Sequence, residues 1–266
     1  MSRLLGERFT VAVGPERVVL ARRAGWRRPA ELKAEAECAA PTAKAAVAAL
    51  SELLARPEIG AGEVTIVLSN HFVHYVLLPW RPEVGGPTEL AAYASILFDE
   101  TFGNEAGGRE ILIGRERAGS ARIAAGIDST LLHGLRSAVG ASKLRLASVQ
   151  PYLSVAFDRV RRTVGKRDFM FVLAEPARSC VLVASGGRWR SLRNTATGAR
   201  PHELAHLIER EAQLAGLADE GMPPVFVHAP GNAALKVPPC QGVTPRTIGL
   251  PQGADDPLLA MALTVT

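Results

Sequence analysis

The sequence has few cysteines and no long apolar run, and both shortages exclude classes of protein. Only 3 of the 266 residues are cysteine. Cys38, Cys180 and Cys240 lie far apart, which argues against a disulfide-stapled secreted domain and against a Cys-x-x-Cys metal site. No apolar run approaches the roughly 20 residues of a membrane-spanning helix, and the first residues lack the apolar core of a signal peptide. A cytoplasmic protein without a membrane span is therefore expected.

Aromatic residues and excess charge of one sign are also scarce. Aromatic residues make up 5% of the chain, and the net charge is +5. Two Trp-Arg patches, at 26–28 and 189–190, offer indole rings on which a nucleobase would stack. Without a repeated basic stripe, they do not predict a nucleic-acid partner. The mild positive charge instead suits an acidic partner or an anionic membrane surface.

Two common catalytic loops are absent from the sequence. The Gly-Ala-Gly stretch at 60–62 lacks the Lys-Ser/Thr pair with which a P-loop grips phosphate and magnesium. No Gly-x-Ser-x-Gly nucleophile elbow occurs. The sequence therefore predicts neither a P-loop NTPase nor an α/β-hydrolase.

The sequence does contain an internal repeat. Residues 169–198 have the pattern of two buried strands and a third, half-exposed strand, with turns at 175–178 and 185–187. Residues 9–23 repeat the first part of this pattern, since 13–17 aligns with 174–178. In both places a strand runs into x-Pro-x-Arg and then into another apolar strand. A repeat half a chain apart predicts two related lobes, 1–150 and 151–266.

Arg17 and Arg178 occupy matching positions in the two repeated turns. They are candidates for contact with an anion or a partner in a cleft that both turns share. The alternative is that both are solvated turn arginines.

Helices and strands are expected in mixed order along the rest of the chain, which predicts an α/β protein with layered sheets. Asp128 is expected to cap the helix that follows it. Helices are predicted at 43–55, 87–102, 131–139, 151–164, 201–217 and 256–263, strands at 64–68, 72–78, 110–115, 121–126, 144–149 and 224–228, and a strand or short helix at 31–38.

One catalytic pattern matches on a predicted helix. His202, Glu203 and His206 form a His-Glu-x-x-His string, which can put two zinc ligands on one helix face with the glutamate as general base. Zinc needs a third ligand, and Glu209 stands where the extended zinc motif has glycine. The alternative is a pair of solvated histidines beside a glutamate that suits the helix dipole.

Four stretches together resemble a known family. A strand pair at 64–79 that ends in Leu-Pro, the strand and helix start at 146–153, the block at 169–198 and the closing segment at 256–263 are similar to the actin-like ATPase fold. Within it they resemble the pilus assembly protein PilM and the cytoplasmic domain of the type II secretion protein GspL. The resemblance implies an actin-like, ribonuclease H-like α/β fold of two lobes, with mixed sheets flanked by helices.

The sequence departs from active members of this fold at all three nucleotide-contacting places. Such members carry Asp and Gly in each phosphate hairpin and Gly-Gly at the adenosine turn. Here the first turn has Gly14 but no aspartate, the second has Glu175 and no glycine, and the third has one glycine, in Gly231-Asn232. The proline in each hairpin also removes a backbone donor. If a nucleotide binds, Gly14, Glu175, Gly231 and Asn232 are the residues expected to contact it, with Glu175 holding magnesium.

The resemblance and these departures favour a non-catalytic scaffold without a cofactor, at the cytoplasmic face of a type IV pilus or type II secretion-like machine. The partners that the resemblance implies are the short cytoplasmic tail of a bitopic inner-membrane protein and an assembly ATPase. The chain is then peripheral to the membrane and binds no nucleic acid, and homodimerisation is left open. The alternatives are an ATP-binding or ATP-hydrolysing protein of the same fold, with Mg-ATP, and a zinc hydrolase using His202 and His206.

Overall fold

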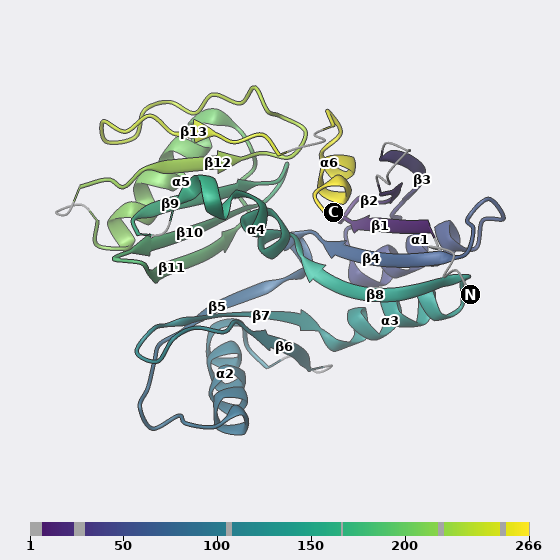
Figure 1. Ribbon diagram of the computed structural model, residues 1–266, viewed down its shortest axis with the longest axis horizontal. Helices are drawn as coiled ribbons and strands as arrows, with labels where there is room; N and C mark the ends of the chain where they lie inside the picture. The colour runs from purple at the N-terminus through teal and green to yellow at the C-terminus, as the bar shows by residue number, and fades with distance from the viewer. Residues whose placement is uncertain are drawn as a thin grey trace, which may run out of the picture.

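The chain folds into two five-stranded mixed sheets and one three-stranded sheet (Figure 1). The computed structural model describes residues 7–23, 30–104, 108–165, 167–217, 221–250 and 254–265. The first sheet has the order β3-β2-β1-β4-β8, with β1 and β4 parallel and β1 and β2 antiparallel. Its strands are β1 (Glu7–Val13), β2 (Arg17–Arg22), β3 (Glu31–Glu37), β4 (Gly62–Leu68) and β8 (Leu144–Pro151).

The second five-stranded sheet repeats the topology of the first. Its order is β11-β10-β9-β12-β13, so that a three-stranded meander again leads to a parallel pair. Every residue of β9 is buried, as its continuous apolar run predicts. We call the part of the chain around the first sheet the first lobe and the part around this sheet the second lobe. The strands are β9 (Phe169–Ala174), β10 (Ser179–Ser185), β11 (Arg188–Thr195), β12 (Val225–His228) and β13 (Arg246–Thr247).

The third sheet, β5-β7-β6, is an insertion in the first lobe between β4 and α3. The hairpin predicted at 110–126 forms β6 (Arg109–Ile113) and β7 (Arg122–Asp128). The strand predicted at 72–78 is shorter, because a 3-10 turn, η1 (Asn70–Phe72), precedes β5 (His74–Leu78). The helix α2 (Pro87–Phe102) packs on this sheet and buries Ala94 and Phe98.

Local signals position the helices of the first lobe. Thr42 caps α1 (Ala43–Leu54), since its side chain accepts a hydrogen bond from the backbone N–H of Ala45. Asp128 caps α3 (Ser129–Gly140) through the N–H of Leu131 at 2.7 Å, as predicted. The two helices pack against each other and on the first sheet.

Three helices belong to the later part of the chain. The helix α4 (Tyr152–Val164) connects the sheets, and α5 (Pro201–Leu214) buries an apolar face against the second sheet. The last helix, α6 (Pro257–Leu263), returns to the first lobe and packs on β1 and β2. Since α1 and α6 both pack on β2, whose central residues 18–21 are at most 1% exposed, the two helices cover its two faces.

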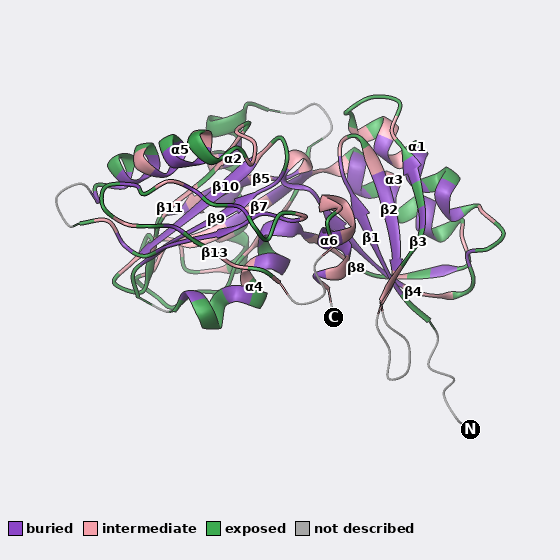
Figure 2. Ribbon diagram, turned by 90° about the horizontal axis from the view of Figure 1, so that it is seen from above, coloured by how far each residue is buried: buried purple, intermediate pink, exposed green. Residues whose placement is uncertain are grey.

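The core runs through both lobes, and the buried strands lie between exposed helix faces (Figure 2). Cys180 is buried in β10, as predicted. The α/β fold with mixed sheets flanked by helices, expected from the sequence, is confirmed. The domain boundaries 1–150 and 151–266 stay a prediction.

Candidate functional site

The two repeated turns face one cavity between the lobes. The turn after β1 and the turn after β9 follow the central strands of their sheets, so the fold brings them to corresponding edges. The cavity has a volume of about 220 Å³. Its walls combine both turns with the end of β4 and the start of α6, and comprise Gly14, Pro15, Glu16, Arg17, Ser69, His71, Glu175, Pro176, Ala177, Arg178, Pro230, Pro257, Leu258 and Met261.

Glu175 is turned into the protein and joins the two lobes. Only 7% of the residue is exposed. Its carboxylate accepts hydrogen bonds from Ser69 Oγ at 2.5 Å, from the backbone N–H of Asn70 at 3.0 Å and from Asn70 Nδ2 at 2.6 Å. Because Asn70 begins η1, its N–H has no partner within the helical turn, and the carboxylate supplies one. Glu175 therefore acts in this structure as an interlobe acceptor.

The residues around this contact extend it into a small network. Tyr75 donates to Asn70 Oδ1 at 2.6 Å, which fixes the orientation of the amide. Asn194 of β11 donates to the carbonyl oxygens of Asn70 and Val73, at 2.8 and 2.9 Å. Burial raises the pKa of Glu175, although the hydrogen bonds from Ser69 and Asn70 favour the ionised form. The network binds η1 of the first lobe to the second lobe.

Arg17 and Arg178 line the same cavity, as the repeat predicts. Arg17 already pairs with two carboxylates: Glu35 on β3, at 2.8 Å, and Asp256, which caps α6. Arg178 is half-buried, and its Nε is buried without a hydrogen-bond partner among the described residues. Contact of either arginine with an external anion stays a prediction.

The two glycines that the resemblance assigns to a nucleotide are covered by the chain itself. A Cβ at Gly14 would lie 2.9 Å from Leu258 Cδ1 of α6. Gly231 has a positive φ of 76°, and a Cβ there would lie 2.6 Å from the carbonyl oxygen of Asp255. Asn232 is exposed at the turn after β12. The segment that begins α6 thus lies against both glycines.

The cavity between the lobes is small for a cofactor site. Pockets for drug-sized ligands and cofactors have volumes of roughly 300–1,000 Å³, and this one has about 220 Å³. The cavity is therefore smaller than a typical cofactor site.

The residues of the His-Glu-x-x-His string lie on the outer face of α5. His202 and His206 are exposed, and Glu203 pairs with Arg200 at 2.7 Å. Among the described residues, no group of three His, Cys, Asp or Glu side chains is arranged to hold a metal ion. The zinc alternative stays a prediction without a third ligand.

Of the two Trp-Arg patches, the structure describes only the second, at 189–190. Residues 26–28 lie outside the described part of the chain. Trp189 lies on β11 and packs with Phe157 and Phe169, at ring-centroid distances of 5.6 and 6.1 Å. Arg190 donates to the carbonyl oxygen of Ala215 at 3.1 Å.

Sequence reasoning missed three residues of the site. Ser69 and Asn70 lie between the strands predicted at 64–68 and 72–78, and Asp256 begins the predicted closing helix. A signal for the first two exists within the first sheet, because they follow β4, the parallel neighbour of β1, and so lie at the same edge as the turn that contains Arg17. No local signal pairs Arg17 with Asp256, which lies 239 residues further along the chain.

The chain has the actin-like fold, as its similarity to solved structures shows. It is similar to a chain of the PilM-PilN type IV pilus biogenesis complex, with a TM-score of 0.64, 14% identity, and coverage of 99% of this chain and 98% of that one. It is also similar to the cytoplasmic domain of EpsL, an inner membrane component of the type II secretion system of Vibrio cholerae, with a TM-score of 0.60, 14% identity and coverage of 98% and 96%.

A third solved structure agrees on the fold. A Bacteroides thetaiotaomicron protein with an actin-like ATPase fold and unknown function has a TM-score of 0.58 at 9% identity, with coverage of 88% of this chain and 86% of that one. No protein-family model matches the sequence, and no curated protein matches it. In the described part of the chain, no helix has the length and apolar character needed to cross a membrane.

Proposed function

We propose that the chain is a non-catalytic actin-like scaffold that binds the cytoplasmic tail of an inner-membrane protein in a pilus or type II secretion-like assembly. It then works in the cytoplasm, peripheral to the inner membrane, and an assembly ATPase is a second partner. Support for the setting comes from the two similar structures, one a PilM-PilN complex and the other a domain of an inner-membrane component.

The observation that carries this proposal is a groove between two edge strands. β6 ends the third sheet and β8 ends the first, so both offer backbone groups for a further strand. A cavity of about 390 Å³ lies between them. Its lining is largely apolar and includes Ile111 and Leu112 of β6 and Leu146 and Val149 of β8.

The polar and exposed residues of this groove fit an extended peptide. Leu112 is 72% exposed and lines the groove together with Ile111, so an added strand would bury apolar surface there. Arg136 of α3 and Glu110 of β6 form a bidentate pair, at 2.7 and 3.0 Å, at the edge of the groove. An added strand gains main-chain hydrogen bonds from the edge and specificity from alternate side chains.

The proposed lack of catalysis rests on the interlobe cavity. The carboxylate of Glu175, the residue that the resemblance assigns to magnesium, accepts hydrogen bonds from Ser69 and Asn70. Leu258 and the residues before it lie against Gly14 and Gly231, where phosphates and adenosine would approach. Both features favour a structural role for this cavity.

The proposal predicts that a bitopic membrane protein is encoded beside this gene, and a synthetic peptide of its cytoplasmic tail provides the test. We expect binding with a Kd in the micromolar range by calorimetry, and a loss of about tenfold or more for Leu112→Asp, because a charge replaces a buried apolar contact. Leu214→Asp is the matched control, since Leu214 is 62% exposed at the end of α5. Equal binding by Leu112→Asp and the unsubstituted protein, or no binding at all, contradicts the proposal.

A further inference from the structure

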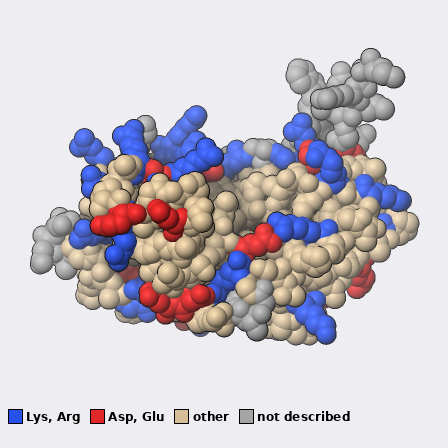
Figure 3. Space-filling model, turned by 90° about the horizontal axis from the view of Figure 1, so that it is seen from below, with Lys and Arg blue, Asp and Glu red and all other residues tan. Residues whose placement is uncertain are grey.

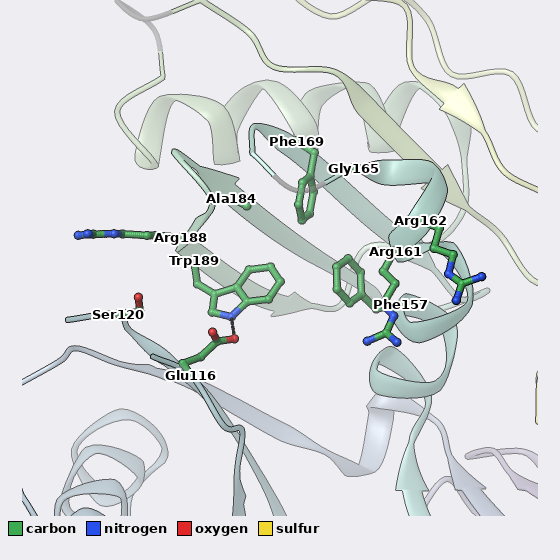
Figure 4. A pocket seen from close by; sticks show the side chains of 11 residues that line it. Glu116, Ser120, Phe157, Arg161, Arg162, Gly165, Phe169, Ala184, Arg188 and Trp189 are labelled. Carbon is green, nitrogen blue, oxygen red and sulfur yellow. Dashed lines mark hydrogen bonds between the residues drawn. The ribbon is translucent and has the colours of Figure 1, made fainter. Parts of the chain in front are cut away.

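A further cavity lies away from both sites described above. It has a volume of about 580 Å³ and shares no lining residue with the groove between β6 and β8. Figure 4 shows that its side chains come from α4, from β9 to β11 and from the loop between β6 and β7. The cavity therefore lies between the second lobe and the third sheet.

Aromatic rings form the floor of this cavity. Phe157, Phe169 and Trp189 pack together, with Phe157 and Phe169 stacked at a centroid distance of 5.8 Å. Phe157 and Trp189 are only partly buried, so both present apolar ring surface to the cavity. Trp189 Nε1 donates to Glu116 Oε1 at 2.7 Å, which fixes the plane of the indole (Figure 4). The floor is thus apolar and held in place before any ligand binds.

Arginines surround this floor. Arg161, Arg162 and Arg188 line the cavity. Among its described lining residues the one acidic side chain is Glu116, whose carboxylate accepts a hydrogen bond from Trp189. Arg161 is 3.6 Å from Asp158 in an exposed pair, and neither Arg162 nor Arg188 forms an ion pair with another described residue. Lys and Arg side chains gather along the edge of the molecule on the side of α4 (Figure 3). The rim is therefore positively charged and has free donors.

We propose that this cavity binds an acidic segment of a partner protein, with an aromatic or long aliphatic side chain of the segment inserted against Phe157 and Trp189. Arg161, Arg162 and Arg188 then contact carboxylates on either side of the inserted residue. Partly exposed aromatic and arginine side chains in a concave site are the residues that dominate binding energy at protein interfaces.

The shape of the site favours a peptide over a membrane surface. A bilayer attracts basic residues that project outward, whereas here the apolar surface lies at the bottom of a hollow, between α4 and the β10–β11 turn. An inserted side chain reaches that surface, and a flat layer of lipid headgroups does not. The proposal does not depend on the tail-binding function, because the two sites are separate.

The test uses a seven-residue probe of alternating Glu and Asp with a central Phe, acetylated and amidated. Fluorescence anisotropy of the labelled probe should give a Kd of about 10–100 µM, weakened about tenfold by Arg162→Glu with Arg188→Glu, since each reversal turns attraction into repulsion. A probe with Ala in place of Phe should bind equally weakly. The control is Lys44→Glu with Lys143→Glu, an equal charge change at exposed residues of the first lobe, which should leave binding within about twofold.

Three outcomes would overturn the proposal. One is no binding of the probe at about 1 mM. Another is the same loss of affinity in the lysine control, which would mean that net charge alone attracts the probe. The last is binding to phosphatidylcholine vesicles with about 30% phosphatidylglycerol, abolished by the arginine reversals while the peptide fails to bind. That result would assign the site to a membrane surface.

Discussion

Asn70 donates two hydrogen bonds to one carboxylate oxygen of Glu175, from its backbone N–H at 3.0 Å and from its Nδ2 at 2.6 Å. The two residues are 105 positions apart and belong to different lobes. A carboxylate that accepts a main-chain and a side-chain donor from the same residue fixes both the position and the orientation of that residue. This contact therefore sets how the two lobes meet at the cavity.

Replacing Glu175 should destabilise the protein. Glu175→Ala leaves the N–H and Nδ2 of Asn70 and the hydroxyl of Ser69 buried without their acceptor, and we expect a loss of about 2–4 kcal/mol in the free energy of unfolding. Denaturant titration at neutral pH measures it. A loss below about 0.5 kcal/mol would mean that water replaces the carboxylate as acceptor and that the contact does not stabilise the folded protein.

Glu175 should also make stability depend on pH in a specific direction. Burial raises its pKa above the ordinary carboxyl value of 4.5, so the folded state binds the proton more tightly than the unfolded state does. The contribution of Glu175 therefore falls as pH rises from the unfolded pKa through the folded one, and is constant above it. The difference in unfolding free energy between the unsubstituted protein and Glu175→Gln should follow this course. A difference that grows as pH rises through this window contradicts the prediction.

Substitutions at two glycines with nearly the same φ should distinguish the cost of backbone strain from the cost of a steric clash. Gly231 and Gly119 have φ of 76° and 79°. A Cβ built at Gly231 lies 2.6 Å from the carbonyl oxygen of Asp255, whereas a Cβ built at Gly119 has no atom of another described segment within 4 Å. Gly119→Ala should cost about 1 kcal/mol for the positive φ. Gly231→Ala should cost roughly 1–3 kcal/mol more, because the chain before α6 must shift. Equal costs would show that this segment is not held against Gly231.

Restoring the phosphate-hairpin residues should not restore nucleotide binding. Glu175→Asp with Pro176→Gly gives the second turn an aspartate and a glycine, but Leu258 still lies against Gly14. The shorter aspartate also withdraws from Ser69 and Asn70. We expect no Mg-ATP binding by calorimetry at about 1 mM nucleotide, for this variant and for the unsubstituted protein. Micromolar affinity in the unsubstituted protein would favour the ATP-binding alternative, and a gain in the variant would show that the cavity opens.

Purified protein should not contain stoichiometric zinc. His202 and His206 are exposed on α5, and the carboxylate of Glu203 is engaged by Arg200. A catalytic zinc site needs three protein ligands and a free general base. Elemental analysis of protein prepared without added metal or chelator measures this directly. One zinc per chain, lost in a His202→Ala variant, would instead support the hydrolase alternative.

The fold was largely predictable because its strongest elements carry local signals. The buried strands β9 and β10 are continuous apolar runs separated by a proline turn, and Asp128 precedes its helix as a capping residue. The start of β5 was not predictable, since Phe72 and Val73 continue the apolar run of the strand, although Phe72 belongs to η1 and β5 begins at His74. There, the capping of Asn70 by Glu175 competes with strand pairing and prevails.

The candidate site was predictable only in part, for a physical reason. The repeat placed Arg17 and Arg178 at matching turns, and symmetry of the two sheets then brings them to one cavity. The partners of Glu175 come from a segment more than 100 residues away, and so does Asp256, one of the two partners of Arg17. Ser, Asn and Asp at turns and caps look alike in the sequence whether they serve their own segment or a distant one.

The return of α6 to β1 and β2 has a consequence for synthesis on the ribosome. The first sheet is encoded mostly within the first third of the chain, yet the face of β2 beneath Met261 and Ala262 is covered only by residues near the other end. During translation that apolar face has no cover until the whole second lobe has been made. The lobe that begins folding first is therefore the last to be completed, and its exposed strands depend on the speed of elongation or on a chaperone in the interval.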